Sequence, residues 1–230
     1  MKKNVMKRKK LILLAVHLYM FLSTLIITIM GVTAGAGAGQ DGDKMKGLGY
    51  FRAFTMDSNI LAGLVSLAIA VMIAINIYKK QEKMPYTLVL LQSIAATAVG
   101  LTFVVAATFL APKQILAGES YFVTFSGDMF FFHFLNPLLA IGAFILGDKD
   151  YLFGSKEILF GLIPPMIYSV VYACCVVYAK VWEDFYGFTF GGKTYTIVPV
   201  SLVIYMISYL IGLLLIKLKN FGKTIKSFRK

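Results

Sequence analysis

The chain has 230 residues and a net charge of +12; 59% of its residues are hydrophobic and only 15% are charged. About 25% of the residues in an ordinary soluble domain are charged, so this composition excludes a typical soluble globular protein and also a disordered polar chain. It predicts a helical protein that crosses a membrane several times.

Long uncharged runs alternate with short charged clusters, and six of these runs are long enough to cross a bilayer. A span needs about 20 apolar residues, and because a backbone in lipid must satisfy its own hydrogen bonds, such runs form helices. The alternating pattern of a membrane barrel is absent. We therefore expect an all-α fold, one domain of six transmembrane helices over about 11–32, 54–78, 86–110, 129–146, 158–179 and 197–216.

Basic residues gather at both ends of the chain and between alternate spans. With the N-terminus inside, the inner segments hold 17 Lys and Arg residues and the outer segments hold 6. The positive-inside rule then puts both termini in the cytoplasm of a multi-pass cell-membrane protein. These flanks meet anionic lipid headgroups, which accounts for the net charge without a nucleic-acid partner.

The first span follows basic residues and precedes small ones, as the core of a signal peptide does. Its apolar run of 22 residues exceeds the usual core of about 7–15 residues. We expect it to remain as a helix, with cleavage as the alternative.

Polar side chains cluster near the outer end of the second span. Asn59 and Ser58 follow Thr55 by four and three residues, so the three share one helix face. Polar groups inside a span are costly and are candidates for function. Arg52, just ahead of the span, fits either a partner for a fatty-acid carboxylate or an anchor at the membrane interface.

The fourth span carries His133 and Asn136, three residues apart, followed by Pro137. The second and fourth spans both run from outside to inside, so their polar residues should lie in the same outer layer. Two other titratable residues inside the spans are given no role: His17 lies at a different depth, and Asp57 points about 200° away from Thr55 at 100° per residue.

The fifth span contains Pro164 and Pro165, which should bend it, and two adjacent cysteines, Cys174 and Cys175. The cysteines show neither metal-ligand spacing nor a disulfide framework, so no metal or cofactor is expected. Aromatic and acidic residues at 182–188 follow this span. They suit either an anchor at headgroup depth or a cap over a site.

A histidine beside a hydroxyl at one depth is a minimal pair of nucleophile and base. His133 can accept the hydroxyl proton of Thr55 and return it to a leaving group, and the amide of Asn59 or Asn136 can donate to a developing oxyanion. Ser58 would support this layer. The alternative is that these groups only form hydrogen bonds between helices, as Thr, Ser and Asn commonly do.

Four short motifs carry a resemblance to a known family. The run 51–61 (FRxFTxxSNIL) resembles the signature that enters the second helix of the androgen-induced-gene/FAR-17a-like family, including its bacterial relatives. The run 133–137 (HFLNP) is similar to that family's H-x-x-x-P in the fourth helix. Pro165-x-x-Tyr168 and the run 184–188 (DFYGF) resemble its fifth helix and the following loop.

Animal members of that family are six-helix hydrolases that cleave fatty acid esters of hydroxy fatty acids with an intramembrane Thr and His. The resemblance therefore implies a membrane lipid ester as substrate, Thr55 as the nucleophile and His133 as the base. The alternative is a non-catalytic transporter, receptor or structural membrane protein that uses the same polar layer for ligand or helix contacts. The sequence does not indicate an oligomeric state.

Overall fold

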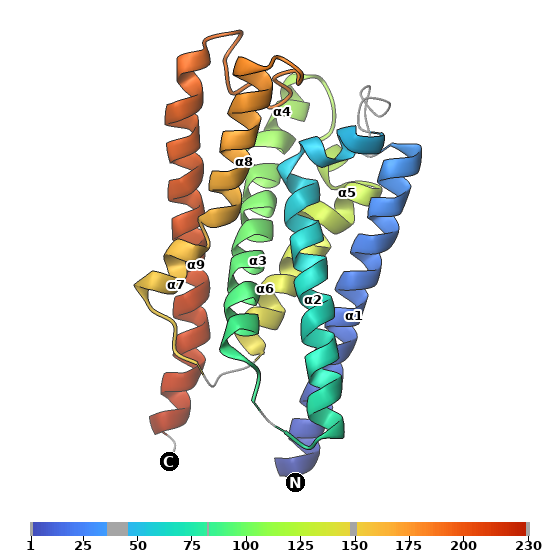
Figure 1. Cartoon of the computed structure of the whole chain (residues 1–230), viewed down its shortest axis with the longest axis vertical. Coiled ribbons are helices and arrows are strands. Elements are labelled where there is room, and N and C mark those ends of the chain that lie inside the picture. Colours follow the sequence, from blue (N-terminus) through green and yellow to red (C-terminus); the bar gives the residue numbers. More distant parts are fainter. Residues whose placement is uncertain (1, 36–45, 82, 148–150, 229–230) are drawn as a thin grey trace.

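The computed structural model describes residues 2–35, 46–81, 83–147 and 151–228, and in this part of the chain every regular element is helical. Six of the helical spans are long and apolar enough to cross a membrane. They pack as an elongated bundle in which α1 begins and α9 ends at the same end (Figure 1). These spans are Arg8–Ala34, Phe54–Tyr78, Tyr86–Leu116, Asp128–Leu146, Ser155–Tyr178 and Thr194–Phe221.

Three spans are single helices and three are composite. The single helices are α1 (Lys2–Ala34), α2 (Phe54–Tyr78) and α9 (Ile197–Phe228), the last preceded by the short turn η7 (Thr194–Thr196). The composite spans are α3 (Tyr86–Val105), η3 (Ala106–Leu110) and α4 (Ala111–Leu116); α5 (Asp128–Phe130), η5 (Phe131–Leu135) and α6 (Asn136–Leu146); and α7 (Ser155–Phe160), α8 (Ile163–Ala173) and η6 (Cys174–Tyr178). Two 3₁₀ turns, η2 (Gly47–Arg52) and η4 (Tyr121–Phe125), precede α2 and α5.

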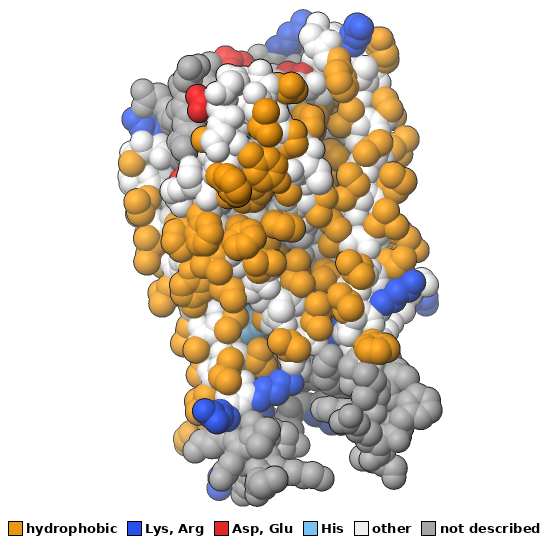
Figure 2. All heavy atoms as spheres, turned by 180° about the vertical axis from the view of Figure 1, so that it is seen from behind, with side chains coloured by type: hydrophobic (Ala, Val, Ile, Leu, Met, Phe, Trp, Pro, Cys, Tyr) orange, Lys and Arg blue, Asp and Glu red, His pale blue; other side chains and the backbone are white. Residues whose placement is uncertain are grey.

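The surface of the bundle is apolar over its middle. Figure 2 shows hydrophobic side chains across the centre of one face, with Lys and Arg side chains toward both ends and Asp and Glu side chains toward the upper end. Large apolar side chains such as Leu22, Leu64 and Val170 are at least half exposed. In water such a surface would drive association, whereas in a bilayer it faces lipid.

Glycines let α1 approach its neighbours closely. A Cβ added to Gly63 of α2 would lie 2.9 Å from the Cβ of Thr24, and a Cβ added to Gly31 would lie 1.9 Å from the ring of Tyr50. Small residues at such contacts allow the dense packing that holds membrane helices together. The buried Tyr50 ring thereby fixes η2, the turn that leads into α2.

The third span contains a π turn that ends at a proline. The N–H of Ala111 donates to the carbonyl of Ala106, five residues back. The next residue, Pro112, has no N–H, so the carbonyl of Ala107 lacks its partner in this register. The hydroxyl of Tyr121 in η4 donates to the Ala107 carbonyl at 2.9 Å. This bond ties the loop after the third span back to the helix.

The fifth span is broken rather than bent. The helix α7 ends at Phe160 and α8 begins at Ile163, with Pro164 and Pro165 in the first turn of α8. A first-turn residue has no N–H partner within its helix, so prolines are tolerated there and end the preceding helix instead. In place of the expected bend, a two-residue turn at Gly161 and Leu162 separates α7 from α8 within one span.

Candidate functional site

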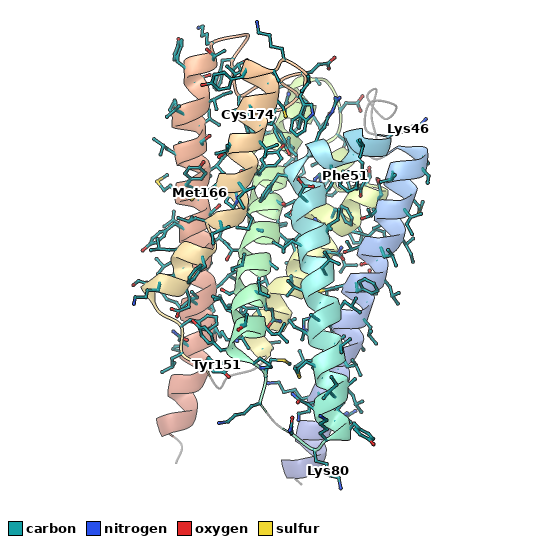
Figure 3. All side chains as sticks on the ribbon, in the orientation of Figure 1. Lys46, Phe51, Lys80, Tyr151, Met166 and Cys174 are labelled. Carbon is teal, nitrogen blue, oxygen red and sulfur yellow. The ribbon has the colours of Figure 1, made fainter. Side chains whose placement is uncertain are left out.

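The site lies at the end of the bundle near Phe51 and Cys174, opposite the end that holds Lys80 and Tyr151 (Figure 3). Thr55 is the second residue of α2, which begins at Phe54, directly after the extended backbone of Ala53. Its side chain is buried, as is that of His133 in η5. The two side chains face each other between α2 and the fourth span.

Two hydrogen bonds define the state of the His133 ring. Its Nδ1 lies 2.7 Å from the backbone carbonyl of Thr124 in η4, and its Nε2 lies 3.3 Å from Oγ1 of Thr55. A carbonyl only accepts hydrogen bonds, so Nδ1 carries the hydrogen and Nε2 presents a lone pair. The Thr55 hydroxyl therefore donates to Nε2, which is the tautomer that a general base requires.

A second π turn shapes the segment that carries His133. The N–H of Asn136 donates to the carbonyl of Phe131, five residues back. The following Pro137 cannot donate, so the carbonyl of Phe132 is left without a backbone partner. Nδ2 of Asn59 donates a hydrogen bond to this carbonyl at 3.1 Å. The proline thus creates an acceptor that fastens the fourth span to α2 beside His133.

The two asparagines are fully engaged in contacts between helices. Asn59 also donates to the carbonyl of Thr55 at 2.8 Å, which accounts for both amide hydrogens. The amide of Asn136 donates to Thr24 Oγ1 and Asn59 Oδ1, both at 3.4 Å, and its oxygen accepts from Ser23 at 3.1 Å. An oxyanion role for either amide would require one of these bonds to break.

Ser58 and Arg52 lie on either side of Thr55 in the sequence, and their contacts differ. The Ser58 hydroxyl lies 3.1 Å from the Thr55 carbonyl and 2.8 Å from Oγ1 of Thr102 in α3. Arg52 is partly exposed, and its backbone carbonyl accepts a hydrogen bond from Tyr168 of α8 at 2.5 Å. Its side chain is not among those that line the pocket described next.

A mostly apolar pocket opens on Thr55. Its walls come from α2, α3, η3, α8, α9 and the loop of residues 179–193, and its cavity volume is about 50 Å³. Phe54, Leu101 and Ile204 contribute apolar surface, while Thr55 is the member of the His133 pair that reaches the pocket. The pair therefore connects a buried imidazole to a small, mostly apolar cavity.

The 179–193 loop is organised around Asp184. Its carboxylate accepts from the Tyr172 hydroxyl at 2.7 Å, from the backbone N–H groups of Phe188 and Thr189 at 2.8 and 2.7 Å, and from the Thr189 hydroxyl at 2.5 Å. Burial alone would raise the pKa of this carboxyl, but the four donors together hold the pKa below its ordinary value. The loop is thus a compact cap rather than a loose connection.

This cap places Tyr186 over the start of α2. The backbone N–H of Phe54 donates to the Tyr186 hydroxyl oxygen at 3.2 Å, and the Tyr186 ring lines the pocket. Neither Tyr186 nor the Thr124 carbonyl was among the candidates from the sequence. The signals for Tyr186 were the aromatic and acidic run at 182–188 and the family resemblance of 184–188 within it, whereas a backbone carbonyl has no signature in a sequence.

His17 belongs to a separate polar cluster. Its Nδ1 lies 3.2 Å from Ser66 Oγ, and the amide Nε2 of Gln92 lies 3.4 Å from its Nε2. With Gln92 as donor, Nδ1 carries the hydrogen and donates to Ser66. This direction is opposite to that in the Thr55 pair, so His17 does not act as a base toward Ser66.

In the part of the chain that the structure describes, no group of three His, Cys, Asp or Glu side chains is arranged to hold a metal ion. No family model matches the chain, and neither a curated protein nor a solved structure matches it.

Proposed function

We propose that this protein is an integral membrane hydrolase that cleaves a lipid ester, with Thr55 as the nucleophile and His133 as the general base. The observation that carries the proposal is the chain of contacts from the Thr124 carbonyl through His133 to Thr55. It leaves an unprotonated Nε2 facing a hydroxyl that opens on an apolar pocket. The resemblance of both residues' motifs to the androgen-induced-gene/FAR-17a-like family supports the same chemistry.

The reaction proceeds through an acyl-threonine. Thr55 Oγ1 forms a bond to the ester carbonyl carbon while its proton passes to His133 Nε2, and the carbonyl π electrons move to oxygen. When the carbonyl reforms, the bond to the alcohol oxygen breaks and His133 returns the proton to that oxygen. A water molecule then repeats the sequence and releases the fatty acid. A positioned base contributes about 10²–10⁴-fold in rate.

The charge distribution supports an orientation of the protein in the membrane for this reaction. The bias of 17 to 6 basic residues favours cytoplasmic termini, which would put the Thr55 site in the outer leaflet of the cell membrane. A lipid in that leaflet can approach from the side, so the substrate need not leave the bilayer.

The test measures release of free fatty acid from a panel of lipid esters, including esters of hydroxy fatty acids, by the purified protein in detergent or liposomes. Thr55→Ala, His133→Ala and the double variant should lose activity by a similar factor of about 10²–10⁴, because the two residues act as a unit. Thr55→Ser should keep part of the turnover. Ser66→Ala, which removes the other buried hydroxyl beside a histidine, is the matched control and should keep full activity.

Full activity of Thr55→Ala would remove Thr55 as the nucleophile. Absence of turnover by the folded wild type across the panel would favour the second candidate, a non-catalytic binding or structural protein. The extensive hydrogen bonding of Asn59 and Asn136 between helices is the observation that favours it.

A further inference from the structure

An ester that reacts at Thr55 needs a donor for the negative charge that develops on its carbonyl oxygen. Such a donor must be fixed beside the nucleophile before the reaction starts. The amide hydrogens of Asn59 and Asn136 already point to other oxygens of the bundle. The donor has to come from the pocket side of Thr55.

The Tyr186 hydroxyl occupies that side. It interacts with the hydroxyls of Thr55 and Tyr168, and its oxygen accepts the N–H of Phe54 at 3.2 Å. Phe54 is the first residue of α2, so this N–H belongs to the positive end of the helix. A hydroxyl that accepts such a bond becomes a stronger donor. Because the hydroxyl hydrogens of Thr55 and Tyr168 go to His133 and to the Arg52 carbonyl, the Tyr186 hydrogen points toward one of these two hydroxyl oxygens, both of which line the pocket.

We propose that the Tyr186 hydroxyl donates the hydrogen bond that stabilises the oxyanion formed when Thr55 attacks an ester. The inference rests on the proposed hydrolase function and adds to it a residue from a different part of the chain. The Tyr186 and Thr55 side chains line the same pocket, so a carbonyl that reaches Thr55 lies beneath the phenol. Tyr168, whose hydroxyl hydrogen already goes to the carbonyl of Arg52, has no hydrogen left for an oxyanion.

The phenol is in the correct protonation state for this role. Burial raises the pKa of Tyr186 to about 12, while hydrogen bonds from its neighbours act in the opposite direction. At neutral pH the hydroxyl therefore keeps its hydrogen and donates it. It stabilises negative charge without transferring a proton, and His133 remains the base.

Asp184 is the positioning residue for Tyr186. It holds the Tyr172 hydroxyl, which in turn accepts the backbone N–H of Tyr186 at 3.4 Å. The Tyr186 ring also stacks on that of Phe188, with centroids 5.0 Å apart and planes at 18°. Gly187 between them has a φ of 76°, which lets the chain turn back so sharply.

The first variant to test is Tyr186→Phe, which removes only the hydroxyl. With an ester that the wild type hydrolyses, kcat should fall by about 10²–10³-fold, with KM little changed, because the bond forms fully only in the transition state. A trifluoromethyl ketone, which forms a tetrahedral adduct with an active hydroxyl, should lose affinity by a similar factor. Tyr195→Phe is the matched control, since Tyr195 is exposed on the same side of the bundle and should behave as wild type.

Asp184→Asn tests the positioning role. It should lower kcat by a smaller factor than Tyr186→Phe, and the double variant should match Tyr186→Phe alone because Asp184 acts through Tyr186. Additive losses would contradict this part of the inference.

The outcomes separate the two proposals. Wild-type kcat and inhibitor affinity in Tyr186→Phe, together with inactive Thr55→Ala, would overturn the oxyanion role and leave the hydrolase standing. A rise in KM at unchanged kcat would also overturn it, because that result describes a substrate contact only. Inactivity of the wild type itself would overturn the hydrolase proposal, and this inference with it.

Discussion

Thr55 carries an ordinary alcohol, and what distinguishes it from Ser66 beside His17 is that the ring nitrogen 3.3 Å away carries no hydrogen. That nitrogen is basic because the other ring nitrogen of His133 is held by a carbonyl. The place of Thr55 and His133 within their spans was enough to predict that they lie at one depth. The sequence could not predict that the Thr124 carbonyl and the Tyr186 hydroxyl join them, because both groups belong to loops whose path depends on the fold.

The tautomer of His133 can be measured without any substrate. In ¹⁵N-labelled protein carrying His17→Gln, the remaining imidazole should show a protonated Nδ1 and an unprotonated Nε2. Thr55→Val should shift the Nε2 resonance because it removes the donor to that nitrogen, while Ser66→Ala should leave the resonance in place. A hydrogen on Nε2 in the wild type would contradict the assigned direction of the Thr55 bond.

At the scale of the elements, the second helix has the predicted bounds, 54–78, and every predicted run lies within or largely overlaps one observed span. Hydropathy suffices for this because each span must cover the same hydrocarbon thickness. The π turns before Pro112 and Pro137 were not predicted. A proline only removes an N–H donor. Whether the preceding helix forms a π turn depends on which side chain donates a hydrogen bond to the carbonyl left without a partner.

The link between Pro137 and Asn59 predicts a coupled effect on stability. Asn59→Leu leaves the buried carbonyl of Phe132 without a donor and should destabilise the protein by about 1–3 kcal/mol. In a Pro137→Ala background the backbone regains an N–H for this region, so the same substitution should cost less. Thermal or denaturant unfolding in detergent measures both steps, and equal losses in the two backgrounds would count against the link.

The contact of α1 with η2 predicts a clear difference between two glycines. Gly31→Ala forces its new methyl group into the Tyr50 ring and should destabilise the protein by about 1–3 kcal/mol, as overpacking does. Gly142→Ala in α6, where a Cβ meets nothing within 4 Å, should be neutral or slightly stabilising because alanine favours helix. Similar melting temperatures for the two variants would show that Tyr50 does not hold η2 in this way.

The whole molecule is a bundle whose two chain ends lie at one end, with the Thr55 site toward the other (Figures 1 and 3). The sequence predicted six spans, because six of its apolar runs are long enough to cross a bilayer, and the described residues contain six such helices. The direction of the bundle in the membrane rests on the basic residues alone.

Labelling of single cysteines in intact cells tests that direction. In a Cys174→Ser, Cys175→Ser background, Glu119→Cys should react with a membrane-impermeant maleimide, because the basic bias puts the loop after α4 outside. Gln81→Cys, at the other end of the bundle, should react only after the cells are opened. The reverse pattern would invert the orientation, and reaction of both in intact cells would contradict the topology.

The central claim is that Thr55 forms a covalent bond during catalysis, and mapping a covalent adduct tests it most directly. The purified wild type, treated with a fluorophosphonate and digested, should carry the label on Thr55, with Ser66→Ala labelled equally. Thr55→Ala should carry none, and His133→Ala should label far more slowly because the hydroxyl keeps its proton. Labelling that persists in Thr55→Ala, or a folded wild type that is neither labelled nor active on any ester of the panel, would contradict the claim.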